Sequence, residues 1–186
     1  DDLPDQGASH IANCISYVKK ICPEILIEIL MPDFRGEKKL IEKIINSKPS
    51  VLAHNLETVR RLSTLVRDSR ASYDQSLNVL KFLKKQSRNI FTKSSLMLGL
   101  GESREETLDA MYDLRKVGVD FLTIGQYLQP SKKQLKVKKY VHPDEFEEFS
   151  QIGEQMGFEY VASGPLVRSS YKAAEFYIER KIRITE

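Results

Sequence analysis

The sequence is poor in cysteine and has no long apolar run. Its two cysteines, Cys14 and Cys22, are too few for a disulfide framework, a closed cysteine zinc site or a four-cysteine iron–sulfur site. No stretch approaches the roughly 20 apolar residues that cross a bilayer, so we expect no membrane span. The first residues lack the basic and apolar regions of a signal peptide. Together these absences favour a reducing compartment and a protein without structural disulfides.

The bulk composition is that of an ordinary globular domain. The 186 residues are 41% hydrophobic and 30% charged, with a formal net charge of +3. A charge this small does not predict a nucleic-acid-binding protein. The length suits one domain, residues 1–186, with a core large enough to fold without disulfides or a structural metal. Because the chain starts with aspartate instead of methionine, we expect its natural N-terminus to lie upstream.

Strand-like and helix-like segments alternate along the chain. Helical spacing of apolar residues, two Ser-x-x-Gln/Glu capping patterns at Ser72 and Ser103, a terminating Gly118 and a helix-starting Pro143 mark the helices. A further helix is expected from about Ser169 to Lys181. Cys14 falls on the apolar stripe of the first helix and is expected to be buried, and Cys22 to be exposed. The short apolar segments between the helices are the predicted strands: 25–30, 51–53, 95–98, 120–124 and 158–162.

This alternation predicts a parallel sheet with crossover helices. A closed eight-stranded barrel needs about 250 residues, more than the chain has. The pattern therefore predicts either an open α/β sheet or part of a barrel whose first strands are missing.

Polar residues and glycines gather directly after each predicted strand, where the active sites of α/β folds lie. Glu28 is the exception, because alternation places it inside a strand, on the face opposite Ile27 and Ile29. A buried carboxylate needs a partner, so we favour a salt bridge to a lysine or arginine over direct chemistry.

Two other features keep alternative interpretations open. His54 is one of three histidines, which lie too far apart in sequence to predict a three-histidine metal site. The lysine-rich segment 132–139 is interpreted as a solvated loop, or as a docking patch for an acidic partner. It lacks the interleaved aromatic residues of a nucleic-acid stacking platform.

The strand-end segments carry a more specific signal. They read Asp-Asp-Leu-Pro-Asp (1–5), Pro-Asp-Phe-Arg-Gly (32–36), His-Asn-Leu-Glu-Thr-Val (54–59), Met-Leu-Gly-Leu-Gly-Glu (97–102), Thr-Ile-Gly-Gln-Tyr-Leu-Gln-Pro (123–130) and Gly-Pro-Leu-Val-Arg-Ser-Ser-Tyr (164–171). In order and spacing this set resembles the motifs of the lipoyl synthase family, and the resemblance covers nearly the whole chain.

The resemblance implies a partial (βα)6 TIM-type barrel of the radical S-adenosylmethionine (SAM) class. It implies a sulfurtransferase that inserts two sulfur atoms at C6 and C8 of a protein-bound octanoyl-lysine, making the lipoyl cofactor. The implied cofactors are S-adenosyl-L-methionine and two 4Fe-4S clusters, one that generates the radical and an auxiliary one that donates sulfur. The implied partners are an octanoylated lipoyl carrier domain or glycine-cleavage H protein, and an electron donor such as ferredoxin or flavodoxin, without nucleic acid or membrane.

The resemblance also carries site residues. Ser170, or with less support Ser169, corresponds to an oxygen ligand of auxiliary-cluster iron, and Arg168 and Glu28 join Ser170 as catalytic candidates. Arg67 and Lys93 are candidates for anionic groups of the cofactor. Gln6 and Ser95 depart from the family pattern, which has glycine at both places. The remaining cofactor-binding candidates are Asp2, Asp5, Gly7, His54, Asn55, Glu57, Gly99, Gly101 and Glu102.

In this family the two cysteine triplets that hold the clusters precede the Asp-Asp-Leu-Pro-Asp motif, and neither triplet is in this chain. We therefore interpret the chain as the C-terminal part of such an enzyme, inactive by itself. The alternatives are a non-catalytic module that binds a lipoyl carrier and another sulfur-inserting radical enzyme. The expected compartment is the bacterial cytoplasm, the mitochondrial matrix or the plastid stroma.

Overall fold

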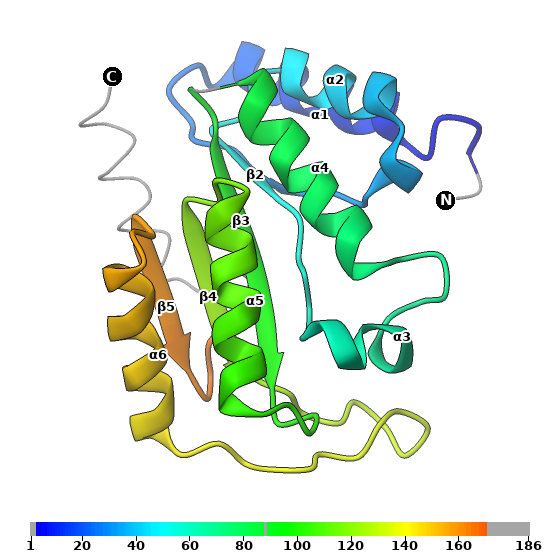
Figure 1. Ribbon diagram of the computed structural model, residues 1–186. Coiled ribbons are helices and arrows are strands. Elements are labelled where there is room, and N and C mark those ends of the chain that lie inside the picture. The colour runs from blue at the N-terminus through cyan, green and yellow to red at the C-terminus, as the bar shows by residue number, and fades with distance from the viewer. Residues whose placement is uncertain (1–2, 88, 171–186) are drawn as a thin grey trace.

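The computed structural model describes residues 3–87 and 89–170. Its centre is a five-stranded parallel sheet in which strands that follow one another in sequence lie side by side (Figure 1). The strands are β1 (Glu28–Leu30), β2 (Val51–Ala53), β3 (Phe91–Leu98), β4 (Phe121–Gln126) and β5 (Tyr160–Gly164).

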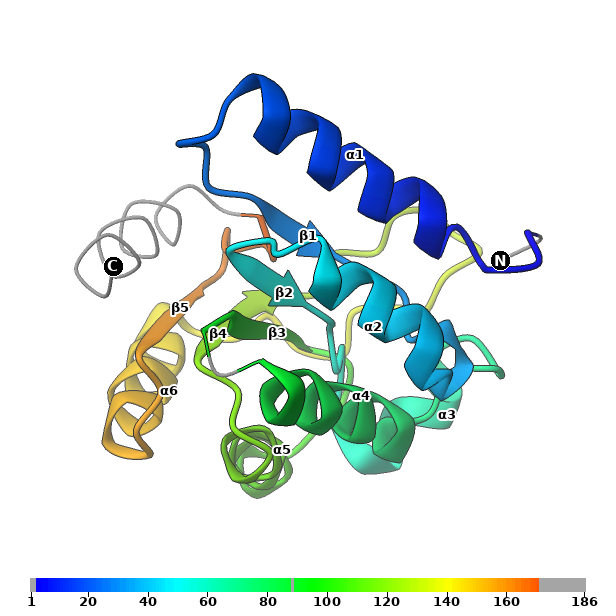
Figure 2. The same ribbon diagram turned by 90° about the horizontal axis from the view of Figure 1, so that it is seen from above.

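Helices connect successive strands and cover one face of the sheet. Seen from above, the sheet is curved, and α2, α4, α5 and α6 lie along its outer side (Figure 2). The predicted partial barrel is thereby confirmed: each strand-to-helix unit returns parallel, and β1 and β5 do not pair within the described residues. The helices are α1 (Ala8–Ile21), α2 (Lys38–Asn46), α3 (Ser63–Val66), α4 (Tyr73–Gln86), α5 (Arg104–Lys116) and α6 (Pro143–Gln155), with 3₁₀ turns η1 (Phe34–Gly36) and η2 (Arg60–Leu62).

Strand alternation divides the buried side chains between two faces. Leu122 and Ile124 of β4 belong to the large core between the sheet and the helices. Phe121 belongs to a smaller cluster on the inner face, where it lies beside Phe91 of β3. The inner face is the wall of the partial barrel, and it carries the polar residues discussed below.

The predicted helix boundaries hold where a local interaction fixes them. Ser103 and Glu106 form a complete capping box at the start of α5, and Ser72 caps α4. Pro143 occupies the first turn of α6, and Gly118 has the positive φ of 89° expected of a residue that ends a helix. None of the helices in the described residues is long and apolar enough to cross a membrane.

Two expectations were wrong. Cys14 is exposed, not buried, because α1 packs against α2 along a narrow strip and leaves the rest of its apolar stripe uncovered. Strand boundaries also differ: β1 begins at Glu28, three residues after the predicted Ile25, and β3 begins four residues before the predicted Ser95. The early part of β3 is polar but buried, and Thr92 and Lys93 there have partners: the Thr92 amide donates to Asp120, and Lys93 donates to Glu28. Cys22 is exposed as expected, and the predicted helix after Ser169 lies almost entirely outside the described residues.

Candidate functional site

The carboxyl ends of β2, β3 and β4 meet the C-terminal segment around a cavity of about 320 Å³, which we name the lumen cavity. It brings together four predicted site residues that are distant from one another in sequence: Asn55, Glu57, Arg168 and Ser169. The rest of the lining is mainly apolar: Ser95, Leu96, Met97, Gly125, Gln126, Tyr127, Leu128, Pro130 and Val167.

Glu57 reaches the cavity through an unusual backbone conformation. Its φ is +70°, in the left-handed region that side chains rarely adopt. Its amide donates to Ser95 O at 2.9 Å, and its carbonyl accepts from Met97 N at 2.8 Å, so β3 holds this conformation from both sides. Backbone strain maintained in this way is typical of functional sites.

Glu57 and Asn55 form a polar pair whose hydrogen-bonding groups are only partly satisfied by the protein. Burial raises the pKa of Glu57, against the opposing effects of a hydrogen bond from Asn55 and the charge of Arg67. The Asn55 side-chain oxygen is buried and has no hydrogen-bond partner among the described residues. A buried acceptor without a partner is costly, so a ligand that donates hydrogen bonds would be stabilised here.

Gly125 leaves the space that the C-terminal segment needs to approach β4 and line the cavity. At Gly125 a Cβ atom would overlap the carbonyl oxygen of Val167, so any side chain would push this segment away from β4. Beyond it, the Arg168 guanidinium donates to Val167 O at 2.7 Å. Ser169 lines the cavity, whereas its neighbour Ser170 is exposed.

Gly99 and Gly101 follow β3, and the structure gives Gly99 a role within the chain. A Cβ at Gly99 would overlap the Gln126 side chain and Lys139 O, so the missing side chain makes room for the loop between β4 and α6. Both carboxylate oxygens of Glu102 accept backbone amides of this turn, from Gly99 at 2.5 Å and Leu100 at 2.9 Å. The three predicted cofactor residues of this turn, Gly99, Gly101 and Glu102, lie at the edge of the site, and none of them lines the lumen cavity.

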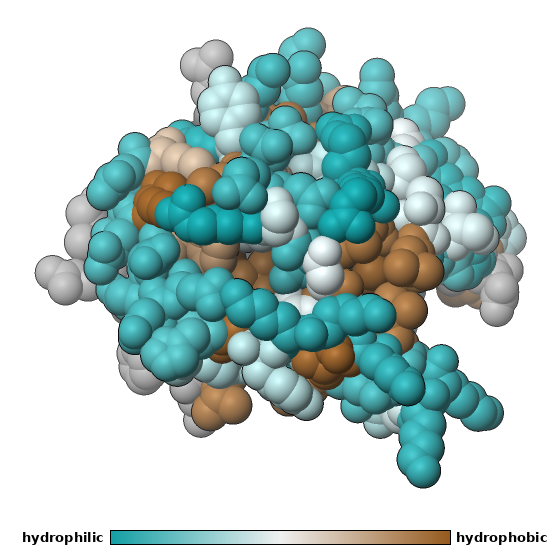
Figure 3. Space-filling model, turned by 60° about the horizontal axis from the view of Figure 1, so that its bottom comes forward, coloured by the Kyte–Doolittle hydropathy of each residue, from teal (hydrophilic) through white to brown (hydrophobic). Residues whose placement is uncertain are grey.

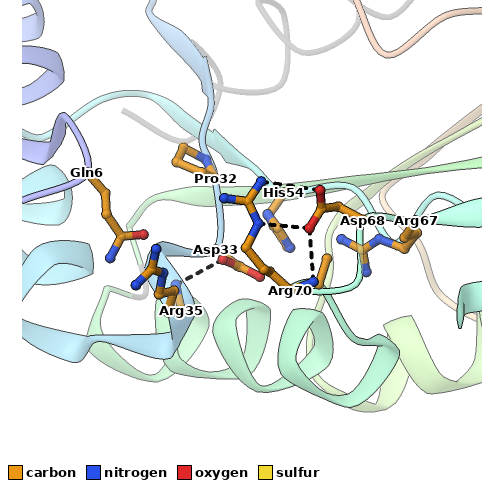
Figure 4. Close-up of a pocket in the computed structure, with 9 residues that line it drawn as sticks. Gln6, Pro32, Asp33, Arg35, His54, Arg67, Asp68 and Arg70 are labelled. Carbon is orange, nitrogen blue, oxygen red and sulfur yellow. Dashed lines mark hydrogen bonds and ion pairs between the residues drawn. The ribbon is translucent and has the colours of Figure 1, made fainter. Parts of the chain in front are cut away.

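A second, smaller pocket of about 200 Å³ lies after β1 and β2, and we name it the arginine pocket (Figure 4). Arg35, Arg67 and Arg70 line it together with Asp33 and Asp68. Burial lowers the pKa of Arg67, although the nearby Glu57 and Asp33 favour its charged form. Of the predicted cofactor residues, Arg67 and His54 line this pocket and not the lumen cavity.

His54 belongs to a buried hydrogen-bond chain. Its Nδ1 lies 3.1 Å from Met31 O, which only accepts, so Nδ1 carries the proton. Its Nε2 lies 2.8 Å from the Ser76 hydroxyl, which in turn accepts from Arg67 Nη1 at 2.8 Å. The imidazole is neutral in this arrangement, and burial lowers its pKa. His54 therefore ties β1, β2 and α4 together beneath the arginine pocket.

Lys93 and Glu28 form an ion pair on the inner face. Lys93 Nζ lies 2.7 and 2.9 Å from the two carboxylate oxygens, and the side chains are 2% and 29% exposed, respectively. The salt bridge favoured for Glu28 is thus confirmed. Its partner is Lys93, which the resemblance had suggested as a binding residue for an anionic group of the cofactor.

The start of the chain also has local partners. Asp5 accepts the backbone amides of Gly7 and Ser9 at the start of α1, and hydrogen bonds with Ser9 lower its pKa to about 2. Gly7 has a φ of +83° at this helix start. Asp2 lies outside the described residues. The cofactor roles predicted for Asp5 and Gly7 stay predictions.

The residues of the lumen cavity suit a nucleoside ligand. A ribose presents two hydroxyl donors, which match the Glu57 carboxylate and the unpartnered Asn55 oxygen, and an apolar lining suits a base. The chain's cysteines do not suit an iron–sulfur cluster. Cys14 and Cys22 are exposed, and the described residues include no cluster of three or more potential metal ligands.

Fold and site together define a partial α/β barrel with a cavity at the carboxyl ends of its strands, where the active sites of such barrels lie. Residues 2–125 match the radical SAM superfamily, and the chain belongs to this family. Membership implies the use of S-adenosylmethionine and iron–sulfur chemistry.

Relatives of known name sharpen this assignment. The chain is 55% identical to the chloroplastic lipoyl synthase 2 of Zea mays over 98% of its own length and 50% of that protein. It is 53% identical to the mitochondrial lipoyl synthase of Branchiostoma floridae over 96% of its length and 48% of that protein. The chain thus spans about half the length of these relatives, and the resemblance drawn from the motifs is confirmed.

A solved structure supports the fold alone. The crystal structure of methylornithine synthase is similar with a TM-score of 0.64 at 14% identity, over 95% of this chain and 62% of that one.

Sequence reasoning missed several members of the site. Gln126 was not singled out, although its buried amide donates to Leu98 O, Tyr127 O and Lys139 O and accepts from Val141 N at 2.9 Å. Its position at the end of β4, within a predicted motif, was the available signal.

Proposed function

We propose that the protein to which this chain belongs is a lipoyl synthase, which inserts two sulfur atoms at C6 and C8 of a protein-bound octanoyl-lysine. The observation that carries the proposal is the identity of 53–55% to proteins of that name, over 96–98% of the chain. The lumen cavity supports it independently, because its polar pair and apolar lining suit a nucleoside beside an acyl chain.

In this proposal Asn55 and Glu57 hold the ribose of S-adenosylmethionine. When bound, this cofactor and its cluster supply a radical that abstracts hydrogen from the octanoyl chain. The chain's own contribution is to orient the ribose and to exclude water with the apolar lining. Arg67, whose charge acts on Glu57, and the arginine pocket would receive an anionic group.

The C-terminal segment would serve the second cluster. We propose Ser170, which is exposed, as the oxygen ligand of auxiliary-cluster iron, and Ser169, which lines the cavity, as the less favoured alternative ligand. Arg168 is a further catalytic candidate. A hydroxyl oxygen is a harder ligand than a thiolate and holds iron of such clusters less well. That would suit a cluster that gives up sulfur.

The two clusters would take their cysteine ligands from the part of the relatives that this chain does not span. Since neither cysteine triplet is in its sequence, we propose that the 186-residue chain alone binds little iron and is inactive. Iron analysis after anaerobic reconstitution tests this directly, and stoichiometric cluster in the chain alone would overturn it.

The function itself is tested with the full-length protein. It is reconstituted with iron and sulfide and supplied with S-adenosylmethionine, a reductant and an octanoylated carrier domain. Mass spectrometry should show two sulfur atoms added and two hydrogens lost on the carrier lysine. Carrier binding without sulfur addition would refute the proposal and support the non-catalytic module. Ser170→Ala should lose the complete product, whereas Ser169→Ala should retain more of it.

A further inference from the structure

The loop that leaves the lumen cavity carries a concentrated positive charge. Residues 127–142, which we name the basic loop, contain five lysines and no aspartate or glutamate. Lys139 is paired with Glu145 at 2.7 Å. The other four are exposed, and no carboxylate of the described residues pairs with them: Lys132, Lys133, Lys136 and Lys138.

The basic loop is fixed to the sheet. The Gln126 amide binds the backbone of Lys139 and Val141, the Tyr127 hydroxyl donates to Leu135 O at 2.8 Å, and Lys138 N donates to Gly99 O at 2.8 Å. The lysines are therefore presented at defined positions, which reduces the ordering cost of binding a partner.

Apolar side chains of the loop point toward the core, and lysine side chains that alternate with them point toward the solvent. Leu135 and Val137 pack against the core, while the alternate residues Lys136 and Lys138 are exposed. Tyr140 is 74% exposed on the same loop. The face of the molecule on which the loop lies carries a hydrophilic band, and hydrophobic residues are exposed next to this band (Figure 3). Tyrosine is enriched in protein–protein interfaces, and the lysines around Tyr140 would attract a partner of opposite charge.

The loop also forms part of the cavity wall. Tyr127, Leu128 and Pro130 line the lumen cavity, and Leu128 is 48% exposed. A partner bound to the lysines would thus contact the same loop that forms part of the cavity wall.

We propose that the basic loop is the docking surface for an acidic face of the protein domain that carries the acyl-lysine. The inference rests on the proposed function for the identity of the acyl group. A protein partner is favoured over nucleic acid because a single exposed tyrosine in the loop is too little for a base-stacking platform, and the chain's net charge is only +3.

The test is a triple charge reversal in the full-length enzyme, Lys132→Glu, Lys133→Glu and Lys136→Glu. The KM for the octanoylated carrier domain should rise about tenfold at low ionic strength, because rim charges govern encounter with a charged partner. The rise should shrink to about twofold near 0.5 M salt, where charges are screened. Turnover of a short octanoyl-lysine peptide, which lacks the carrier's folded face, should be unchanged.

A matched control changes net charge equally on another face, with Lys81→Glu, Lys85→Glu and Lys116→Glu on the outer helices α4 and α5. It should leave the KM for the carrier unchanged. An equal rise in both triple variants, or no rise in the first, would overturn the proposal.

Direct binding separates this inference from the proposed function. If the wild-type enzyme makes no lipoyl product, the function fails, yet fluorescence anisotropy with a labelled carrier domain still reports docking. Loss of carrier affinity in the basic-loop variant alone would support the surface. Loss of affinity only for a single-stranded oligonucleotide, with carrier affinity intact, would overturn it in favour of a nucleic-acid surface.

Discussion

The ion pair between Glu28 and Lys93 makes a sharp prediction, because its two members differ in burial. Glu28→Gln removes the charge opposite an ammonium group that is 2% exposed, and leaves that ammonium buried without a counter-ion. Lys93→Met leaves a carboxylate that is 29% exposed and can still reach water. Breaking a buried pair costs about 3–5 kcal/mol. We place Glu28→Gln in that range and Lys93→Met at roughly half of it, because water can still solvate the remaining carboxylate.

The double variant Glu28→Leu, Lys93→Met replaces the pair with apolar side chains. Such replacements are often neutral, since both desolvation penalties disappear with the charges, so we expect a change within about 1–2 kcal/mol. The free energies of unfolding are measured by urea titration monitored by circular dichroism, with constant m-values as the check that unfolding stays two-state.

The order of the single variants is the decisive result. If Lys93→Met cost as much as Glu28→Gln or more, the argument from burial would be wrong. If the double variant were as unstable as Glu28→Gln, the pair would be essential for a reason other than charge compensation.

Three further predictions concern residues in and next to the two pockets. Gly99→Ala should destabilise the protein by about 1–3 kcal/mol through overpacking, while Gly101→Ala, whose Cβ would meet only the Lys138 side chain at 3.6 Å, should cost less; urea titration compares them. Burial lowers the pKa of His54 below its ordinary 6.5, so the unfolded state binds the proton more tightly and stability should fall as pH drops below about 6.5. His54→Gln should be less stable at pH 7 and show a flatter pH dependence of the unfolding free energy; an unchanged slope would contradict the assignment. Burial raises the pKa of Glu57, so its charge at pH 7 disfavours the folded state, and Glu57→Gln should raise the Tm without ligand while weakening S-adenosylmethionine binding about tenfold in calorimetry. A lower Tm, or unchanged affinity, would count against that role.

Local sequence signals were sufficient for the elements of the fold. The capping box at Ser103 and the proline at 143 act within a few residues, so the helices they start could be located without knowledge of distant contacts. The polar residues after each strand were informative for a similar reason, because parallel strands deliver their carboxyl ends to one edge of the sheet. The prediction for Cys14 failed because a stripe of apolar residues does not reveal how much of it another helix covers.

The sequence by itself determined the parallel α/β pattern, the strand-end location of the site and the likeness to lipoyl synthases. Only the tertiary structure decided which predicted residues share a cavity. It joined Asn55 and Glu57 to the C-terminal segment, and assigned His54 and Arg67 to a separate pocket. It also paired Lys93 with Glu28, 65 residues away. The physical reason is that partners of buried charges and the space beside a glycine are set by chain segments distant in sequence, which no local pattern records.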